Sequence, residues 1–477
     1  MIIKNNKKGS VLAYALVIMA IVAIISTSLL RYITSQLNFS FYRSEKEQSF
    51  QVAEAGIYFY RWYLAHQVSG KTAQQIKTFW QSGNPYGVNT PYEAEFFDPE
   101  GGAIGKYKIQ VDAPDLDSTI VMVKSTGWTY KDPDVKRVVQ ARFRRPSWSE
   151  FAVAANDVMR FGAGTEVYGK IHSNNGIRFD GVAHNIVSSS MDKYDDPDHS
   201  GGNEFGVHTH ISPTDSLPPN AVPQRADVFQ AGRQFPLPVI DFNGILSDLN
   251  NIKTESKIAG HGLYFDQTGG GRRIILKNNG TFDVCTVDTY SSSSYSISKY
   301  KRTSGGGTCD TCSGQCLKNY VMPTNGVIFV EDNIWVEGTV NNSRVTIVAA
   351  NLIGGTKANI YIGDNNLVYT NFDGKDIIGL IAQQNVSVVL NSQTNLTIDA
   401  ALLAQSGRVG RDYYSGNHKN SITVNGSIAT NLRYGFAYTD GTGYTTRVLN
   451  FDNNLLYYPP PYFPTGTEYS IDLWDEL

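Results

Sequence analysis

The hydrophobic pattern of this chain begins with one uninterrupted apolar segment. Residues 10–30 contain no charged side chain, and Lys7, Lys8 and Arg31 flank them. As a helix at about 1.5 Å per residue, this segment spans about 30 Å, the thickness of the hydrocarbon core of a bilayer. Because basic residues precede the segment, the positive-inside bias predicts a cytoplasmic N-terminus and an external remainder. We therefore predict a single-pass protein of the cytoplasmic membrane.

The helical pattern continues past the apolar segment to residue 66. Apolar positions recur there at roughly helical spacing, with charged residues between them, and no Gly or Pro occurs before Gly56. A cleaved secretory signal is the alternative, but such signals have a shorter apolar region followed by the small residues of a cleavage site. Here the small residue, Gly9, precedes the apolar region. We predict one helix over residues 10–66.

Residues 67–146 predict a small β head. Three segments with β patterning, 104–112, 119–128 and 135–143, are separated by turn-prone sequences, which favours an antiparallel meander. Pro146 marks a plausible boundary to the next region.

Residues 147–464 have a different rhythm, in which short apolar runs alternate with Gly and Asn. The runs leave little room for crossover helices, which indicates a solenoid, and we predict a right-handed parallel β-helix. An antiparallel β-sandwich is the alternative, because a single sequence does not determine strand register. Within this region, the irregular residues 188–325 predict a loop insertion, and residues 465–477 predict a C-terminal tail. The fold class is thus mainly β with one long N-terminal helix.

Composition adds limits on the partners. The chain has 477 residues, too many for one compact core, and 44 Gly and 28 Tyr favour a β-rich extracellular architecture. The net charge of -3 lacks the excess of basic residues that binds a nucleic-acid backbone, so no nucleic-acid partner is predicted.

The order of a basic leader (residues 1–9), Gly9 and an uncharged helix resembles the class III signal of type IV prepilins. The AEAG sequence at residues 53–56 adds a resemblance to PilX-type minor pilins and to large K-type pseudopilins. The resemblance implies cleavage after Gly9 by a prepilin peptidase and methylation of Ser10. It also implies an inner-membrane assembly platform and other pilins as partners, and a final location in a pilus on the cell surface. The long helix laid on a meander is what the pilin fold looks like.

Tyr14 departs from the pattern of this family. Major pilins carry a Glu as the fifth mature residue, and here that position is Tyr14. An unpaired carboxylate in hydrocarbon costs about a few kcal/mol, so a subunit without a partner for it can lose it. In K-type pseudopilins the same lack goes with a position at the filament tip, which favours a minor subunit here. Of the other helix residues, Arg31 ends the apolar segment and Glu54 and Gly56 carry the resemblance, although Glu54 is equally explained as a solvated helix residue.

The four cysteines lie within the irregular segment, at Cys285, Cys309, Cys312 and Cys316. In an exported protein they favour two disulfides, for which three connectivities exist. A metal site with four thiolate ligands is the alternative, because C-x2-C is a common zinc motif. Either arrangement would staple a Gly/Ser-rich loop.

Acidic residues and histidines gather in another part of the irregular segment: Asp192, Asp195, Asp196, Asp198, His199, His208 and His210. The acidic residues lack the Gly and Glu spacing of an EF-hand. The histidines invite a metal interpretation, but we interpret the segment as a mobile polar loop and predict no metal site.

Parallel β-helices host enzymes that cleave polysaccharides with clustered carboxylates. The candidates here are Asp364, Asp373, Asp376 and Asp399, with Arg408 and Arg411 nearby in the sequence. No spacing singles out a catalytic pair, and aspartates beside Gly are typical of turns. We therefore predict neither enzymatic activity nor a cofactor.

Aromatic residues cluster in loops near the end of the chain: Tyr413, Tyr414, Tyr434, Phe436, Tyr438 and Tyr444. Such a composition suits contact with a surface glycan or a protein ligand, and packing in the core is the alternative. Two hypotheses follow. The first is a minor type IV pilin-like subunit that contributes to pilus assembly or to the filament tip and adheres through its large β domain. The second is a membrane-anchored, polysaccharide-acting β-helix enzyme.

Overall fold

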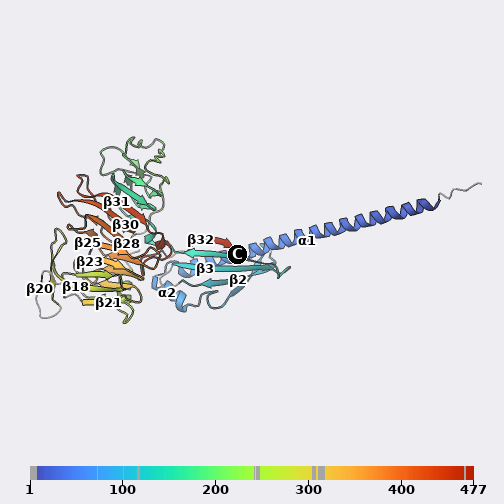
Figure 1. The fold of residues 1–477 in the computed structure, drawn as a ribbon, viewed down its shortest axis with the longest axis horizontal. Helices are drawn as coiled ribbons and strands as arrows, with labels where there is room; N and C mark the ends of the chain where they lie inside the picture. The colour runs from blue at the N-terminus through green and yellow to red at the C-terminus, as the bar shows by residue number, and fades with distance from the viewer. Residues whose placement is uncertain are drawn as a thin grey trace, which may run out of the picture.

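The computed structural model describes residues 8–71, 73–99, 101–114, 119–145, 147–240, 242, 248–302, 308–309, 317–466 and 469–477. Three parts follow one another along its long axis: a projecting helix, a small β head and a large body of short strands (Figure 1).

The projecting helix is α1 (Lys8–Val68), which agrees with the predicted helix to within two residues at each end. Residues 11–44 are all exposed, and burial begins at Glu45. In the second half, Val52, Ile57, Tyr60 and Leu64 are at most 1% exposed, and their spacing of three to five residues places them on one face of the helix. The helix is therefore half free and half packed.

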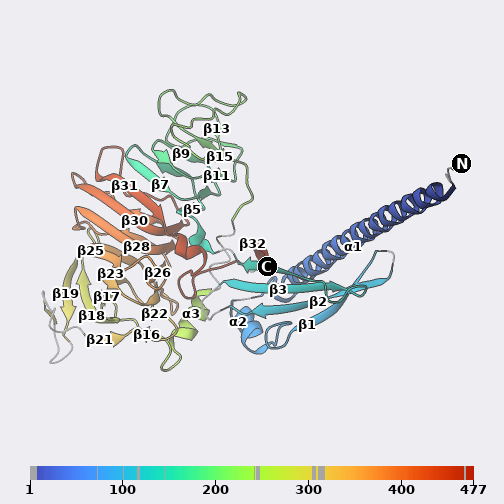
Figure 2. The ribbon, with the colours of Figure 1, turned by 45° about the vertical axis from the view of Figure 1, so that its right-hand side comes forward.

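The packed half of α1 lies on a five-stranded antiparallel sheet, which we call the head sheet (Figure 2). The strands, in spatial order, are β1 (Tyr92–Phe97), β2 (Ala103–Asp112), β3 (Ile120–Thr129), β4 (Lys136–Arg144) and β32 (Ser470–Glu476). The predicted meander corresponds to β2, β3 and β4. A short helix, α2 (Ala73–Ser82), connects α1 to the sheet.

The C-terminal strand β32 corrects the prediction of a C-terminal tail over residues 465–477. It pairs antiparallel with β4, from Ser470 opposite Arg144 to Glu476 opposite Val139. As an edge strand it leaves nearly all of its side chains exposed, so the segment lacks the apolar alternation that reveals a buried strand. The region between β4 and β32 is thus an insertion into the head sheet.

This inserted region is built from parallel strands in successive turns, and we call it the parallel stack. One row of the stack is, in spatial order, β16 (Leu263–Phe265), β22 (Val327–Val330), β24 (Arg344–Ala349), β26 (Ile377–Ala382), β28 (Asn395–Ala404), β30 (His418–Thr430), β5 (Val153–Ala155), β8 (Ile171–Ser173), β11 (Val187–Ser189) and β15 (Arg233–Gln234). Every one of these pairings is parallel, as the coil prediction required and unlike an antiparallel sandwich. The right-handed sense of the coils stays a prediction.

The other sides of the stack are formed by β17 (Arg272–Lys277), β23 (Ile334–Val340), β25 (Ile360–Tyr369), β27 (Val386–Val388), β29 (Val409–Arg411), β31 (Gly443–Phe451), β7 (Thr165–Tyr168), β10 (Val182–Ala183), β6 (Met159–Phe161), β9 (Ile177–Phe179) and β14 (Val207–His208). Antiparallel strand pairs lie at both ends of the stack. At one end they are formed by β18 (Thr281–Tyr290), β19 (Ile297–Lys301), β20 (Thr308–Cys309) and β21 (Leu317–Val321). At the other end β12 (Lys193–Tyr194) pairs with β13 (Glu204–Phe205). Among the described residues of the region are also the short 3-10 helices η1 (Trp148–Glu150) and η3 (Asn453–Leu456).

The chain enters the stack in the middle. Strand β5, the first of the region, pairs with β30 near its end, with Ala154 opposite Ala429. From β5 the strands proceed outward to β15, whereas the chain from β16 onward winds back from the opposite end (Figure 2). The predicted loop insertion over residues 188–325 is corrected accordingly, because it contains the strands that extend both ends of the stack.

In the central strands, successive side chains point to opposite faces of the sheet, and each face packs into a different hydrophobic core. The apolar runs of these strands are therefore buried on both faces. Ile328 and Ile347 belong to the interior of the stack, whereas Phe329 and Val348 face an outer cluster. That outer cluster includes Leu249 of α3 (Asp248–Ser256), which covers β22.

The proline-rich segment 459–464 runs along the flank of the stack. Arg344 Nη2 donates to the carbonyl of Pro459 at 2.6 Å, and a Cβ on Gly379 would lie 2.5 Å from Pro460, so only glycine fits at that point. The segment then returns to the head beside the outgoing chain, where the Trp148 N–H donates to the carbonyl of Pro464 at 3.1 Å. The two connections between the head and the stack therefore lie next to each other.

Candidate functional site

The free half of α1 is the largest exposed apolar surface of the described residues. Its large apolar side chains from Val11 to Tyr42 are between 44% (Ile33) and 70% (Tyr14) exposed. The helix reaches a mean hydropathy of 2.4 over an 18-residue window, and it is long and apolar enough to cross a membrane. Soluble proteins rarely leave so large an apolar area uncovered, so this surface requires lipid or other helices around it.

Two threonines in the free half bond to the backbone of their own helix. Thr27 Oγ1 donates to the carbonyl of Ala23 at 2.6 Å, and Thr34 Oγ1 donates to that of Leu30 at 2.9 Å. Such internal bonding is what hydrocarbon demands of polar groups, because no water is available there.

The predicted processing residues occupy the start of α1. Gly9 and Ser10 are helical, but their side chains, and residues 1–7 of the predicted leader, lie outside the described residues. Tyr14 and Arg31 are both exposed. Neither takes part in the packing of the head.

Gly56 lies at a close contact between α1 and β3. A Cβ at this position would lie 2.2 Å from Ser125 Oγ, and a Cβ at Gly127 would lie 2.2 Å from the backbone nitrogen of Ala53. Both glycines are therefore needed for the helix to approach the sheet. Glu54 is half-buried beside this contact. Sequence reasoning missed Gly127, whose signal is a glycine inside a strand pattern.

Glu45 marks the point where the packed half of α1 begins. It is 4% exposed and accepts hydrogen bonds from Lys131 Nζ at 2.6 Å and from Thr129 Oγ1 at 2.8 Å. The hydrogen bond from Lys131, and more weakly that from Thr129, holds the pKa of the Glu45 carboxyl below its usual value, against the effect of burial. One turn later, Ser49 Oγ donates to the carbonyl of Val135 at 2.9 Å. These bonds fix the exit of the free half from the head.

Of the carboxylates considered for catalysis, Asp364 and Asp373 line different pockets, whereas Asp376 and Asp399 accept hydrogen bonds from the adjacent residues Thr370 and Tyr369. Asp376 accepts from the N–H groups of Thr370 and Asn371, and Asp373 accepts from that of Lys375, as turn residues do. Asp399 is 3% exposed and accepts from the Tyr369 N–H at 2.9 Å, and its burial raises its pKa.

The two predicted arginines are engaged elsewhere in the stack. Arg408 donates to Asp412 at 2.8 Å and to the Tyr438 hydroxyl at 3.1 Å. Arg411 is fully buried and donates to Asn417 at 2.5 Å.

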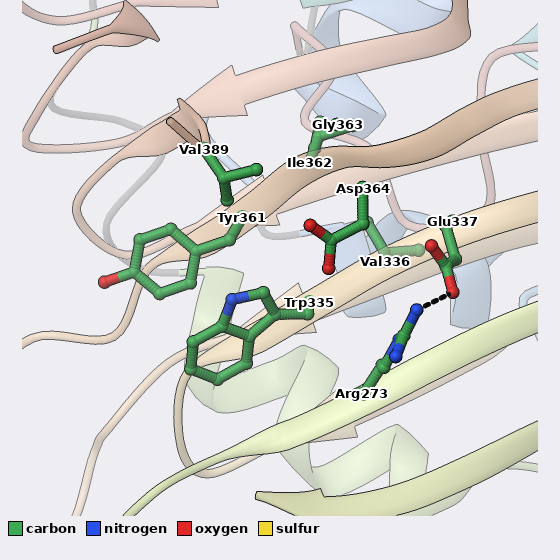
Figure 3. A pocket seen from close by; sticks show the side chains of 9 residues that line it. All are labelled: Arg273, Trp335, Val336, Glu337, Tyr361, Ile362, Gly363, Asp364 and Val389. Atoms are coloured by element: carbon green, nitrogen blue, oxygen red, sulfur yellow. Dashed lines mark hydrogen bonds and ion pairs between the residues drawn. The ribbon is translucent and has the colours of Figure 1, made fainter. Parts of the chain in front are cut away.

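Asp364 lies in a small pocket on the outer side of the stack (Figure 3). Arg273 donates to Glu337 at 2.5 Å and to the Tyr300 hydroxyl at 2.6 Å, and Asp364 faces the same guanidinium. Burial raises the pKa of Asp364, which Arg273 partly offsets. The cavity is about 10 Å³, room for one water at most and far below the size of a ligand pocket, so it is a buried polar cluster of the stack.

The cysteines are described only in part. Cys285 in β18 is 4% exposed and disulfide-bonded, so it is not a free thiolate for a metal. The side chain of Cys309 and all of Cys312 and Cys316 lie outside the described residues, and the pairing stays a prediction.

The aromatic cluster is mainly core. Tyr414, Tyr434, Phe436 and Tyr444 are at most 7% exposed, which favours the core-packing alternative for these four. Tyr438 is half-buried and lines an open groove with the side chains of Arg160, Arg408 and Arg433. Tyr413 is 53% exposed.

The histidines and aspartates of residues 192–210 divide into two groups. Asp192 and Asp195 are exposed, and Asp198 pairs with Arg433 and with Arg160 at 3.5 Å. The second group, Asp196, His199, His208 and His210, converges with Glu204, which sequence reasoning did not single out. The polar-loop interpretation did not foresee this convergence.

Comparisons with known proteins give likenesses among solved structures alone. No protein-family model matches the chain, and no curated protein matches it. Among solved structures, it is similar to the competence-associated pilin ComZ from Thermus thermophilus, with 13% sequence identity over 91% of this chain and 98% of that chain, at a TM-score of 0.31. A likeness at that level carries no argument, so the fold rests on the strand pairings and contacts given above.

Proposed function

We propose that this chain is a minor pilin-type subunit that is anchored by α1 in the membrane and then packs by the same helix in a filament. One observation carries the proposal: a single continuous helix is bare over its first half and covered by its own head over its second. The helix laid on an antiparallel sheet is the arrangement that the pilin resemblance implies.

The length of the bare half supports a protein partner in addition to lipid. Residues 11–44 span about 50 Å as a helix, whereas hydrocarbon covers only about 30 Å. Beyond Arg31, the apolar Ile33, Leu37 and Phe41 are 44%, 52% and 58% exposed. Apolar side chains outside the bilayer and outside the head are what a neighbouring helix would cover.

The position of the parallel stack supports a place at the filament tip. The stack lies at the end of the head opposite the free helix (Figure 1). A subunit at the tip has no subunit above it, so this bulk meets no neighbour there. Tyr14, in place of the acidic residue of major subunits, agrees with the same position. The groove beside Tyr438 then faces outward and offers an adhesive surface for a glycan or a protein.

Processing after Gly9 tests the first step. When the chain is co-expressed with a prepilin peptidase, mass spectrometry of the N-terminal peptide is expected to show a chain that starts at methylated Ser10. The Gly9→Leu variant, and a catalytically inactive peptidase, should leave residues 1–9 in place. A wild-type chain that keeps Met1 beside an active peptidase would overturn the pilin proposal.

Photo-crosslinking tests the filament contact directly. A photoreactive amino acid at Leu37 is expected to capture another pilin in assembled filaments. The same group at Ile57, which is 1% exposed inside its own head, is the matched control and should give only intramolecular products. Equal intermolecular yields at the two positions would contradict helix packing by the free half.

A further inference from the structure

A compact group of histidines and carboxylates lies at the outer end of the stack, near β13 (Figure 2). His208 ends β14, which pairs in parallel with β9, and Glu204 belongs to β13, which pairs with β12. The backbone N–H of His210 donates to Asp180 Oδ1 at 2.8 Å, and that of His199 donates to the carbonyl of Asp196 at 3.0 Å. Strand pairing and backbone bonds therefore hold all the members in place.

His210 is at the centre of the group. Its Nε2 lies 3.3 Å from Glu204 Oε1, and the Nδ1 atom of His199 lies 3.2 Å from the same oxygen. On the other side, His208 Nε2 lies 3.5 Å from Asp196 Oδ2. In each of two triplets, Asp196–His208–His210 and His199–Glu204–His210, the possible ligand atoms all lie within 4.8 Å of one another.

The innermost atoms of the group have no hydrogen-bond partner. Asp196 Oδ2 and His208 Nε2 are buried and have no hydrogen-bond partner, in residues that are 2% and 0% exposed. Most buried polar atoms are hydrogen-bonded, and each one left unpaired costs about 1–3 kcal/mol. Asp196 Oδ2 and His208 Nε2 face each other at 3.5 Å, and a metal ion that accepts a lone pair from each would be the missing partner.

One basic side chain also lies near the group. Arg178 Nη1 lies 3.6 Å from Asp196 Oδ2, while its Nε donates to Asp180 at 2.7 Å. Imidazole and carboxylate groups are both common metal ligands in proteins.

We propose that Asp196, His208 and His210 bind one divalent transition-metal ion of the Zn²⁺ class, and that Glu204 and His199 complete the site on its solvent side. Imidazole with carboxylate suits Zn²⁺ and its neighbours, whereas Ca²⁺ and Mg²⁺ prefer all-oxygen ligands. The His199 side chain is 39% exposed, which gives the ion a route from solvent. The ion fastens residues 196–210 to the end of the stack.

Metal titration of the intact chain in detergent, without a histidine tag, tests this proposal. After removal of metals with EDTA, Zn²⁺ is expected to bind at one equivalent by calorimetry, and Co²⁺ is expected to give the visible absorption of a low-symmetry nitrogen and oxygen site. Both signals should be lost in His208→Gln and in His210→Gln. Zn²⁺ binding should be weaker in Glu204→Gln, which removes a ligand from the solvent side of the site.

His418→Gln is the matched control, because this exposed histidine belongs to the same stack but lies outside the group. Asp196→Asn provides a variant of unchanged shape in case a histidine variant fails to fold. Absence of stoichiometric Zn²⁺ and Co²⁺ binding in the wild-type chain would overturn the proposal. So would equal binding by the wild-type chain and the folded His210→Gln or Asp196→Asn variant. Neither result bears on processing after Gly9, so the pilin proposal is judged separately.

Discussion

The two halves of α1 differ in surroundings although they form one continuous helix. In the packed half, a face of apolar residues meets the head sheet, and glycines on both partners permit close approach. In the free half, apolar residues point in all directions and none is buried. The free half is helical without burial against the rest of the chain, so helix formation there does not depend on a partner within the chain. The stability of the head, by contrast, depends on the packed half of the helix alone. Three changes break or sharpen this difference.

The largest contrast is expected between Ile57→Ala and Ile24→Ala. Ile57 is 1% exposed in the head core, so its truncation should cost about 2–5 kcal/mol in the free energy of unfolding of the head. Ile24 is 65% exposed, and its truncation should leave that free energy unchanged. Chemical denaturation in detergent, followed by tryptophan fluorescence, measures both. Equal losses would mean that the free half also supports the head.

A smaller loss is expected from Gly56→Ala. The new methyl group would overlap Ser125 Oγ at 2.2 Å and forces α1 away from β3, at a cost of about 1–3 kcal/mol. Because the hydroxyl is the nearest obstacle, Ser125→Gly should recover part of the loss in the double variant. Thermal unfolding of the four chains gives the coupling between the two positions. Additive effects would show that the overlap is not the cause.

The smallest effect is expected from Glu45→Gln. Because the pKa of Glu45 is lowered in the folded head, its ionised form contributes stability above its unfolded value of about 4.5. That contribution is lost as the pH falls through the folded pKa. Lys131 is 70% exposed, so the pair is worth at most about 1 kcal/mol. The variant should therefore be less stable than the wild-type chain at pH 7, and the difference should shrink as the pH falls through the folded pKa of Glu45. A difference that persists in acid would assign the effect to packing.

Local patterns were sufficient to predict the helix and the meander. The helix follows from an apolar run without Gly or Pro, and β2, β3 and β4 follow from alternation between turns, because both patterns involve neighbours in sequence. The parallel pairing of the stack also agreed with its short apolar runs. Glu45, by contrast, resembles any charged residue on a helix surface until Lys131 is placed against it.

The rest depends on contacts between distant residues. Nothing local in β5 indicates that Ala154 pairs with Ala429, and the exposed side chains of β32 give no sign that it completes the head sheet. The histidine group needed the turn at residues 196–199 and the pairing of β14 with β9 before its members met. The spacing of residues along the chain reveals neither the turn nor the strand pairing.

The adjacency of the two chain connections has a mechanical consequence. β4 leaves the head at Arg144, and β32 begins opposite that residue at Ser470. A pull on the outer end of the stack therefore enters the head through two neighbouring strands at the same edge and in the same direction. The load is shared between them, and it acts along the strands, so the hydrogen bonds between β3 and β4 resist it together and do not open one after another.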